Sequence, residues 1–179
     1  DDIGQKEPLR RLFWARFSCQ SSTLLVATAH LTWPGHPSEW ETDENLRKVQ
    51  TRRMVEALDT RQLPREPCFV GGDFNESFWP KMLLTRGGFV SCFSALGLPE
   101  RPTHPMRPTL AHEDQNADAA LDWLFARSPQ EGEGAGCAKP LLASVVDDMC
   151  ALSSDDPSET AVLSVAPSDH RPVMAVYRI

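Results

Sequence analysis

The sequence predicts a mixed α/β domain, and three features in its first half lead to this prediction. Two apolar runs rich in strand-forming residues, 9–17 and 23–31, are separated by turn residues and predict an antiparallel hairpin. Apolar residues at helical spacing predict a helix over 43–59. A short apolar strand at 68–70 follows, which completes a strand–helix–strand unit. In such a unit the two strands can end at the same edge of one sheet.

The predicted helix combines one apolar stripe with a charged surface. Its stripe consists of Leu46, Val49, Met54, Ala57 and Leu58. Thr42 or Asp43 is the expected N-terminal cap. Basic residues such as Arg47 lie off the stripe with acidic residues between them. We therefore interpret this side as a solvated face, with contact to nucleic acid as the alternative.

The second half of the chain alternates short apolar runs with loops. Strands are predicted at 119–126 and 141–146, and an alternating pattern over 173–179 predicts a closing strand. The sequence contains 179 residues, without an internal repeat or a linker that would divide it. We therefore expect a single domain over residues 1–179, large enough for a sizeable core.

Composition and charge limit the possible partners. The hydrophobic content of 41% and the charged content of 24% are ordinary for a soluble globular protein. The net charge of −7 gives no general attraction to nucleic acid, so any binding of phosphate must depend on a local metal or a few cationic side chains. No apolar run approaches the length that spans a membrane, so no transmembrane segment is expected.

Five cysteines are widely spaced along the chain, and no Cys-x-x-Cys pair suggests zinc. Scattered cysteines of this kind are typical of reduced residues in an intracellular protein. The expected compartment is the cytoplasm or the nucleus.

The most informative stretch is Gly71-Gly72-Asp73-Phe74-Asn75, which follows the strand at 68–70. On extended backbone, residues two apart point to the same side, so Asp73 and Asn75 would project together from a strand end. That arrangement suits a hard cation with a phosphate beside it. The alternative is a turn in which these side chains bond their own backbone.

Three other segments also place polar residues at the end of an apolar run. His30 ends the second strand, Asp122 lies within an apolar segment, and Asp169 and His170 precede the closing strand. A histidine simply bonded at a strand end is the alternative for His30. An unpaired buried carboxylate is costly, so Asp122 requires a partner. In the Pro-rich stretch after residue 99, Thr103 and His104 either line a substrate site or belong to a surface loop.

Taken in order, these segments resemble the endonuclease/exonuclease/phosphatase superfamily. The matching pieces are "HL" at residue 30, "GGDFNES" from residue 71, "LDWLFAR" from residue 121 and "SDHRPV" from residue 168. Each piece is weak alone, whereas the ordered set with these intervals is specific. The resemblance implies the deoxyribonuclease I-like fold, a two-sheet α/β (α+β) sandwich flanked by helices.

The resemblance covers only the C-terminal half of the family's domain. Members of the family begin with a strand that carries an Asn, and then supply a metal-binding Glu, both of which would precede residue 1. We therefore expect an N-terminally truncated domain, whose missing half is its first partner. A lone half would expose a large apolar sheet face.

The resemblance also implies roles for matching residues. Asp73 would bind or orient the attacking water close to the metal, and Asn75 would donate to a phosphate oxygen or hold that water. His170 would contact the scissile phosphate and stabilise the developing charge. Asp122 would pair with His170, which fixes the tautomer of the imidazole and raises its pKa.

The metal implied by the resemblance is Mg²⁺, with Mn²⁺ as a possible substitute. Asp73, Asn75 and Asp169 would lie around it, since a hard cation is held by few carboxylates plus waters and substrate oxygens. His30 would touch the phosphate or assist the leaving oxygen, and its usual acidic partner would lie upstream.

The expected function is a Mg²⁺-dependent phosphoester hydrolase, either a phosphodiesterase (including a nuclease) or a phosphatase, which uses metal-activated water. Nucleic acid, a nucleotide and a phospholipid head group are the candidate substrates. The alternative is an incomplete or inactive half-domain that acts as a binding module. We expect residues 1–179 alone to show little or no activity.

Overall fold

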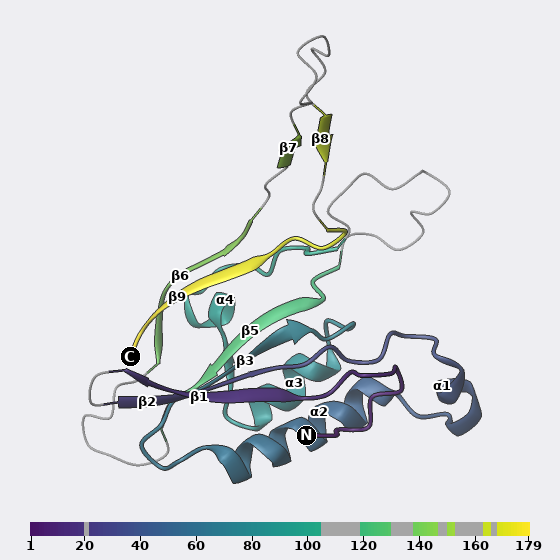
Figure 1. The fold of residues 1–179 in the computed structure, drawn as a ribbon, viewed down its shortest axis with the longest axis horizontal. Coiled ribbons are helices and arrows are strands. Elements are labelled where there is room, and N and C mark those ends of the chain that lie inside the picture. Colours follow the sequence, from purple (N-terminus) through teal and green to yellow (C-terminus); the bar gives the residue numbers. More distant parts are fainter. Residues whose placement is uncertain (20–21, 105–118, 130–137, 147–149, 153–162, 166–167) are drawn as a thin grey trace.

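The computed structural model describes residues 1–19, 22–104, 119–129, 138–146, 150–152, 163–165 and 168–179. A five-stranded sheet with the order β1-β2-β3-β5-β4 forms its centre (Figure 1). These strands are β1 (Phe13–Cys19), β2 (Ser22–Thr28), β3 (Cys68–Asp73), β4 (Val90–Ser91) and β5 (Asp122–Arg127). The predicted hairpin is confirmed because β1 and β2 pair antiparallel, and the strand–helix–strand unit is confirmed because β2 and β3 pair in parallel.

The two longest described helices cover one face of this sheet. The described helices are α1 (Pro37–Thr42), α2 (Leu46–Arg61), α3 (Trp79–Arg86) and α4 (Cys92–Ala95). Helices α2 and α3 lie side by side under the sheet (Figure 1). Met54 and Leu58 of α2 are fully buried in the main hydrophobic core, together with Leu25, Val70 and Phe125 of the sheet. The burial of Met54 and Leu58 confirms this part of the predicted apolar stripe. None of the described helices is long and apolar enough to cross a membrane.

The predicted start of the long helix was wrong by three residues. The chain first forms α1, whose N-cap is His36, and this helix ends at Asp43 in a left-handed conformation with φ of 53°. Helix α2 then begins at Leu46, and the side chain of its N-cap, Asn45, accepts a hydrogen bond from the amide of Lys48. The left-handed residue separates two helices, so Thr42 and Asp43 close the first one and do not cap the second.

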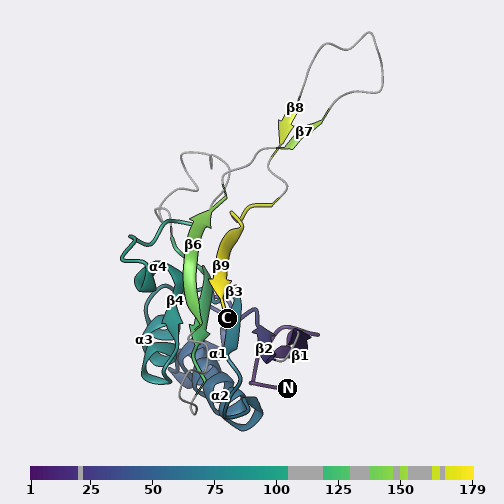
Figure 2. The same ribbon diagram turned by 90° about the vertical axis from the view of Figure 1, so that its left-hand side faces the viewer.

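A second, smaller sheet packs on the other face. Strands β6 (Lys139–Val145) and β9 (Val173–Arg178) pair antiparallel and cover part of β3 and β5. The ring of Tyr177 packs edge-on against Phe69 of β3, with 5.0 Å between centroids. The predicted closing strand is thus confirmed, with its inner face toward the first sheet. A short ribbon of β7 (Cys150–Leu152) and β8 (Leu163–Val165) extends away from both sheets (Figures 1 and 2).

The part of the second face formed by β1 and β2 is not covered by described residues. Strands β1 and β2 extend beyond β9 on the side away from β6 (Figure 2). Leu25 faces the helices, so by strand alternation Phe13 and Phe17 face the opposite side. Both rings are more than half exposed, at 59% and 53%. The first sheet therefore has one closed face and one half-open face.

Candidate active site

Side chains from four separate segments meet at one edge of the five-stranded sheet. His30 lies just beyond the end of β2, Asp73 ends β3, and Asp122 begins β5. Since β2 and β3 are parallel and β5 runs antiparallel to β3, these three positions share one edge. His170 reaches the same edge from the loop before β9 and bonds Asp122. The structure therefore brings together four of the six residues that the sequence nominated.

Asp73 is the central carboxylate of this site. Its Oδ2 lies 3.1 Å from Nε2 of His30 and 3.9 Å from Nε2 of His170, and its Oδ1 accepts the amide of Asn75 at 2.8 Å. Burial opposes ionisation, but the hydrogen bonds from His30 and the Asn75 amide outweigh it, together with the nearby imidazoles. The pKa of Asp73 consequently lies below its ordinary value. A carboxylate that stays ionised and faces two imidazoles suits the binding of a cation or a water proton.

His170 and Asp122 form the shortest contact among the four clustered side chains. Nδ1 of His170 lies 2.7 Å from Oδ2 of Asp122, and both side chains are largely buried. Burial disfavours the charged imidazole, but the hydrogen bond to Asp122 and the negative charges of Asp122, Asp73 and Asp169 prevail, so the pKa of His170 is raised. With Nδ1 engaged, Nε2 is the nitrogen left to face a ligand. This pairing answers the need of Asp122 for a partner.

The geometry of Asn75 differs from the expected one. Asn75 has a φ of 52°, so Asp73 and Asn75 do not lie on continuous extended backbone. The amide of Asn75 instead closes a turn onto Asp73, and its side-chain nitrogen donates to the carbonyl of Leu31 at 2.9 Å. The turn that sequence reasoning treated as the alternative is therefore present. It leaves Oδ2 of Asp73 directed at the histidines.

The two glycines before Asp73 allow the strands to approach closely. A Cβ at Gly72, where φ is 143°, would lie 2.0 Å from the carbonyl oxygen of Ala29. A Cβ at Gly71 would lie 2.8 Å from the carbonyl oxygen of Trp123. Side chains at either position would push β3 away from the segment that carries His30 and from the strand that carries Asp122. The Gly-Gly pair is thus required by the site's backbone.

Asp169 occupies a different part of the site from Asp73. Among the described residues, two groups bring potential ligand atoms within 4.8 Å of one another. One consists of Asp73, Asp122 and His170, and the other of His104, Asp169 and His170. His170 belongs to both groups, whereas the exposed carboxylate of Asp169 joins only the second.

Thr103 and His104, for which the sequence left open a substrate site or a surface loop, lie at the site. Oγ1 of the buried Thr103 accepts the amides of Leu121 and Asp122 at 3.0 and 3.1 Å, and its carbonyl accepts the amide of Arg171 at 2.6 Å. One residue thereby holds the backbone on both sides of the His170–Asp122 pair. The ring of His104 lies 4.7 Å from that of His170, centroid to centroid. The only sequence signal was their place in a long Pro-rich stretch.

Buried polar side chains hold the backbone that follows β2. The carbonyl of His30 accepts from Gln5 at 3.0 Å, and that of Leu31 accepts from Arg10 at 3.0 Å. The amide of Thr32 donates to Gln50 of α2 at 3.0 Å. Gln5 is 25 residues from His30 in sequence, and Gln50 is 18 residues from Thr32. Sequence periodicity cannot reveal contacts over such separations. These contacts set the position of His30 relative to Asp73.

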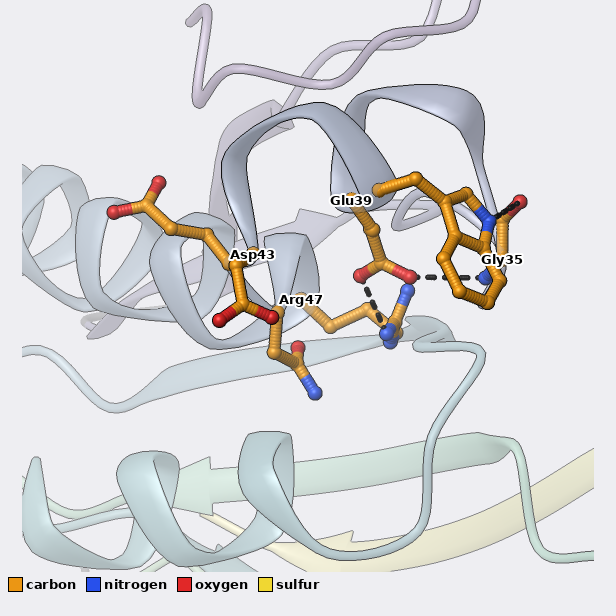
Figure 3. Close-up of a pocket in the computed structure, with 7 residues that line it drawn as sticks. Gly35, Glu39, Asp43 and Arg47 are labelled. Atoms are coloured by element: carbon orange, nitrogen blue, oxygen red, sulfur yellow. Dashed lines mark hydrogen bonds and ion pairs between the residues drawn. The ribbon is translucent and has the colours of Figure 1, made fainter.

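The expected solvated position of Arg47 was wrong. Arg47 is only 4% exposed, and its guanidinium bonds Glu39 at 2.7 Å, Glu76 at 2.9 Å and the carbonyl of Thr32 at 3.1 Å. It joins α1, α2 and the loop after β3, so its charge is satisfied inside the protein. Figure 3 shows Glu39 between Gly35 and Arg47, in a pocket of about 310 Å³ beside α1.

A separate hollow of about 260 Å³ reaches the site from the half-open face of the sheet. His30 and Asp73 line it together with Arg10, Arg11 and Phe13. Arg10 is paired with Glu7 at 2.9 Å and also donates to the carbonyl of Leu31, whereas the described contact of the Arg11 guanidinium is with the carbonyl of Arg10. This combination of cations with a histidine and an aspartate is suited to a phosphate group.

Comparison with known proteins gives matches in structure only. No protein-family model matches the sequence, and no curated protein matches it at a significant level. Among solved structures, D. rerio TDP2 complexed with a single-stranded DNA product superposes with a TM-score of 0.67 at 16% identity, over 99% of this chain and 65% of that one. A beta toxin mutant from Staphylococcus aureus with bound magnesium ions gives 0.65 at 14% identity, over 94% and 58%. Sphingomyelinase C from Streptomyces griseocarneus gives 0.60 at 15% identity, over 93% and 57%.

These matches cover nearly all of this chain but only 57–65% of the chains just compared. At identities of 14–16% such likeness establishes the fold. The helix-covered sheet with a second sheet on its other face agrees with this result. The chain therefore has the fold of these proteins, the deoxyribonuclease I-like fold that the sequence motifs implied.

Proposed function

We propose that the protein is a Mg²⁺-dependent phosphoester hydrolase that uses a water molecule as the nucleophile. The observation that carries the proposal is the His170–Asp122 pair, with a 2.7 Å contact, whose free Nε2 lies 3.9 Å from the ionised Asp73. A carboxylate to take a proton and an oriented imidazole to stabilise phosphate charge are the groups that hydrolysis of a phosphoester needs. Fold alone does not decide the activity, so the proposal depends on these contacts.

In this proposal Asp73 orients the attacking water and accepts its proton. Its lowered pKa keeps the carboxylate in the form that accepts a hydrogen bond at neutral pH. His30, 3.1 Å from the same oxygen, lies where it can contact a phosphate oxygen or the leaving oxygen. The side-chain nitrogen of Asn75, Nδ2, donates one hydrogen to the carbonyl of Leu31. Its second hydrogen remains to hold the water or a phosphate oxygen.

His170 contacts the scissile phosphate in this scheme, and Asp122 orients His170. The raised pKa increases the fraction of His170 that carries a proton near neutral pH. A protonated Nε2 donates to a phosphoryl oxygen as negative charge develops there. Asp122 orients the ring through Nδ1 and stabilises its positive charge, and Thr103 holds the backbone of Asp122.

The donor set at the sheet edge fits a hard divalent cation. Asp73 would hold Mg²⁺, or Mn²⁺ in its place, with the amide oxygen of Asn75 and the carboxylate of Asp169 nearby. Carboxylate and amide oxygens are ligands that Mg²⁺ accepts. When bound, the ion supplies charge neutralisation of the phosphate and a lower pKa for water.

The proposed substrates are nucleic acid, a nucleotide or a phospholipid head group. The similar structures support the first and the last of these, since one holds a single-stranded DNA product and another is a sphingomyelinase. The hollow lined by His30, Arg10 and Arg11 has the charge needed for the phosphate that these substrates share.

We also propose that a further half-domain of the same protein completes the site. The chain spans 57–65% of the similar structures. Phe13 and Phe17 of β1 are exposed, and β1 lies beyond the edge of β9 that pairs with no described strand (Figure 2). Strands added at that edge would cover the two rings and approach the hollow at His30 and Asp73. The added half would supply a metal-binding Glu and an Asn.

A second candidate function is a binding module without catalysis. The half-open face favours it, because Phe13 and Phe17 offer apolar surface to a partner; Leu141, Met174 and Val176 are exposed separately, on the second sheet. In that case the polar cluster would be structurally present but would turn over no substrate.

The deciding experiment assays the full-length protein against bis-p-nitrophenyl phosphate, single-stranded DNA and sphingomyelin. Hydrolysis of at least one substrate is expected with Mg²⁺, and its loss is expected with EDTA and in His170→Ala. His36→Ala is the matched control, since the His36 ring caps α1 by accepting the amide of Ser38 and has no described contact with the residues of the cluster. Activity that persists in both EDTA and His170→Ala would refute the site, and no activity with any substrate in the folded protein would favour the binding module.

A further inference from the structure

We propose that His104, Asp169 and His170 form a second cation site, selective for a borderline metal ion such as Zn²⁺, through which that ion blocks the phosphate-binding imidazole. The binding itself is independent of the proposed hydrolase function, whereas the blocking rests on it.

The three side chains offer ligand atoms in one small region. One nitrogen or oxygen from each lies within 4.8 Å of the others. Ligands of one zinc ion, each about 2.0–2.2 Å from the metal, lie somewhat closer than this. The imidazoles are tilted by 52° with centroids 4.7 Å apart, so they are neighbours without being stacked face to face. Small side-chain rotations would bring the three donors around a single ion.

His170 has the environment of a metal-binding histidine. A ligating imidazole usually donates its other ring N–H to a carboxylate, which fixes the tautomer and strengthens the ligand. Nδ1 of His170 makes such a contact with Asp122 at 2.7 Å, so Nε2 is the nitrogen available to a metal. The neutral form of the ring, with the proton on Nδ1, is the form that binds.

The other two ligands combine a held backbone with an accessible side chain. His104 pairs with Ala119 through two backbone hydrogen bonds of 3.1 and 2.9 Å, which hold its segment beside the His170 loop. The carboxylate of Asp169 is exposed, and the hydroxyl of Ser168 lies 3.5 Å from it. An exposed carboxylate rotates at little cost, so it can complete a set of three protein ligands.

The donor chemistry distinguishes this site from the proposed Mg²⁺ site. Two imidazole nitrogens and one carboxylate oxygen suit Zn²⁺, and three protein ligands leave a position open for water or an anion. Mg²⁺ prefers oxygen ligands and octahedral geometry, so it competes poorly for imidazole nitrogen. The two sites share Asp169, which the Mg²⁺ proposal also places near its ion, and His170, whose Nε2 lies 3.9 Å from Asp73. Occupation by Zn²⁺ would remove this nitrogen from the phosphate.

The binding experiment titrates Zn²⁺ into the metal-free full-length protein by calorimetry and follows the ring protons of its histidines by NMR. We expect His104 and His170 to shift together, and His104→Asn to weaken the binding by at least about tenfold, as loss of even an outer partner costs 10–100-fold. His36→Asn is the matched control and should bind as the unmodified protein does. No binding, or equal affinity in His104→Asn, would overturn the site.

The activity experiment adds Zn²⁺ at micromolar concentrations to the Mg²⁺-dependent assay. Inhibition is measured relative to the activity of each protein without Zn²⁺; it is expected in the unmodified protein and in His36→Asn, whereas His104→Asn should need at least about ten times more Zn²⁺ for the same fractional inhibition. Equal inhibition of all three proteins would refute the blocking. If Zn²⁺ binds through His104 but no substrate is hydrolysed under any condition, the hydrolase proposal fails while the metal site stands.

Discussion

The two histidine–aspartate pairs at the edge of the sheet differ in how closely they are held. His170 lies 2.7 Å from Asp122, and its side chain is 25% exposed. His30 lies 3.1 Å from Asp73, and its side chain is 46% exposed. The first pair is covered by the loop before β9, and both of its contacting side chains belong to this chain. The second opens into the hollow on the half-open face of the sheet.

The carboxylates of the two pairs also differ in the number of groups that they contact. Asp122 makes its side-chain contact with His170, and its backbone is fixed by Thr103. Asp73 is shared, since it faces His30 and His170 and accepts the amide of Asn75. A carboxylate with a single imidazole partner orients that partner, whereas a shared one sits where several groups converge on a ligand. We infer that Asp122 is a positioning residue and Asp73 a reacting one.

The largest effect that this comparison predicts follows from Asp73→Asn. The amide cannot accept a proton from water and carries no charge for a cation or for the two histidines. We expect kcat to fall about 10³-fold or more, within the range for loss of a general base. Asp43→Asn is the matched control, because Asp43 is an exposed aspartate in a left-handed conformation that asparagine also adopts. Activity within tenfold of the unmodified protein would show that Asp73 is not the reacting carboxylate.

Asp122→Asn is expected to cost about 10²-fold in kcat, because it leaves the imidazole in place but removes its orienting charge. The pKa of His170, now raised above 6.5, should fall toward or below that value in the variant. NMR titration of the His170 ring measures this directly and does not depend on activity. An unchanged pKa would contradict the role of Asp122 in stabilising the imidazolium.

The same pair makes stability depend on pH. The folded protein binds the His170 proton more tightly than the unfolded chain does, since the folded pKa is the higher one. The stabilisation from this pair is thus fully present below pH 6.5 and is lost as the pH rises through the raised pKa. In Asp122→Asn this part of the pH dependence of the free energy of unfolding should disappear, which denaturation at several pH values tests.

His30→Gln should have a smaller effect than either aspartate change. Glutamine retains a donor that can reach Asp73 or a phosphate oxygen, so one weakened hydrogen bond is the expected loss. A decrease of about tenfold in kcat/KM corresponds to 1.4 kcal/mol, a normal value for such a bond. If His30→Gln lowers the activity as much as Asp73→Asn does, His30 is as important for the reaction as the aspartates. The proposed difference between the two pairs would then be wrong.

The sequence was sufficient to predict which polar residues share the sheet edge. His30, Asp73 and Asp122 each adjoin an apolar run, and the rules for connecting strands place such ends together. Their arrangement within the edge was not accessible in this way. The positive φ of Asn75 turns its side chain toward Leu31, and periodicity carries no information on such a local rotation.

Residues that act across long separations were also missed. Arg47 resembles any basic residue on a helix surface, yet it is buried between two carboxylates, one from α1 and one from the loop after β3. Helix α1 was not among the predicted elements. Both depend on tertiary contacts between segments 8–29 residues apart, and a single sequence gives no measure of these.

Thr103 gives the most selective test of how the covered pair is held. Thr103→Val keeps the shape of the side chain but leaves the amides of Leu121 and Asp122 without their acceptor at a site only 1% exposed. We expect the free energy of unfolding to fall by about 1–3 kcal/mol, the cost of a buried donor without a partner. The activity should fall only several-fold, because Asp122 and His170 are both still present.

The conservative change Thr103→Ser separates positioning from packing. Serine retains the hydroxyl but loses the methyl group, so it should restore the His170 pKa and kcat while recovering only part of the stability. Thr60→Val is the matched control, since the Thr60 hydroxyl bonds the Ala57 carbonyl on the exposed side of α2. If Thr103→Val loses stability but leaves the pKa of His170 unchanged, Thr103 supports the fold alone. A lowered His170 pKa in Thr103→Val that returns to its raised value in Thr103→Ser would mean that the short contact of His170 with Asp122 depends on a hydroxyl 19 residues before Asp122.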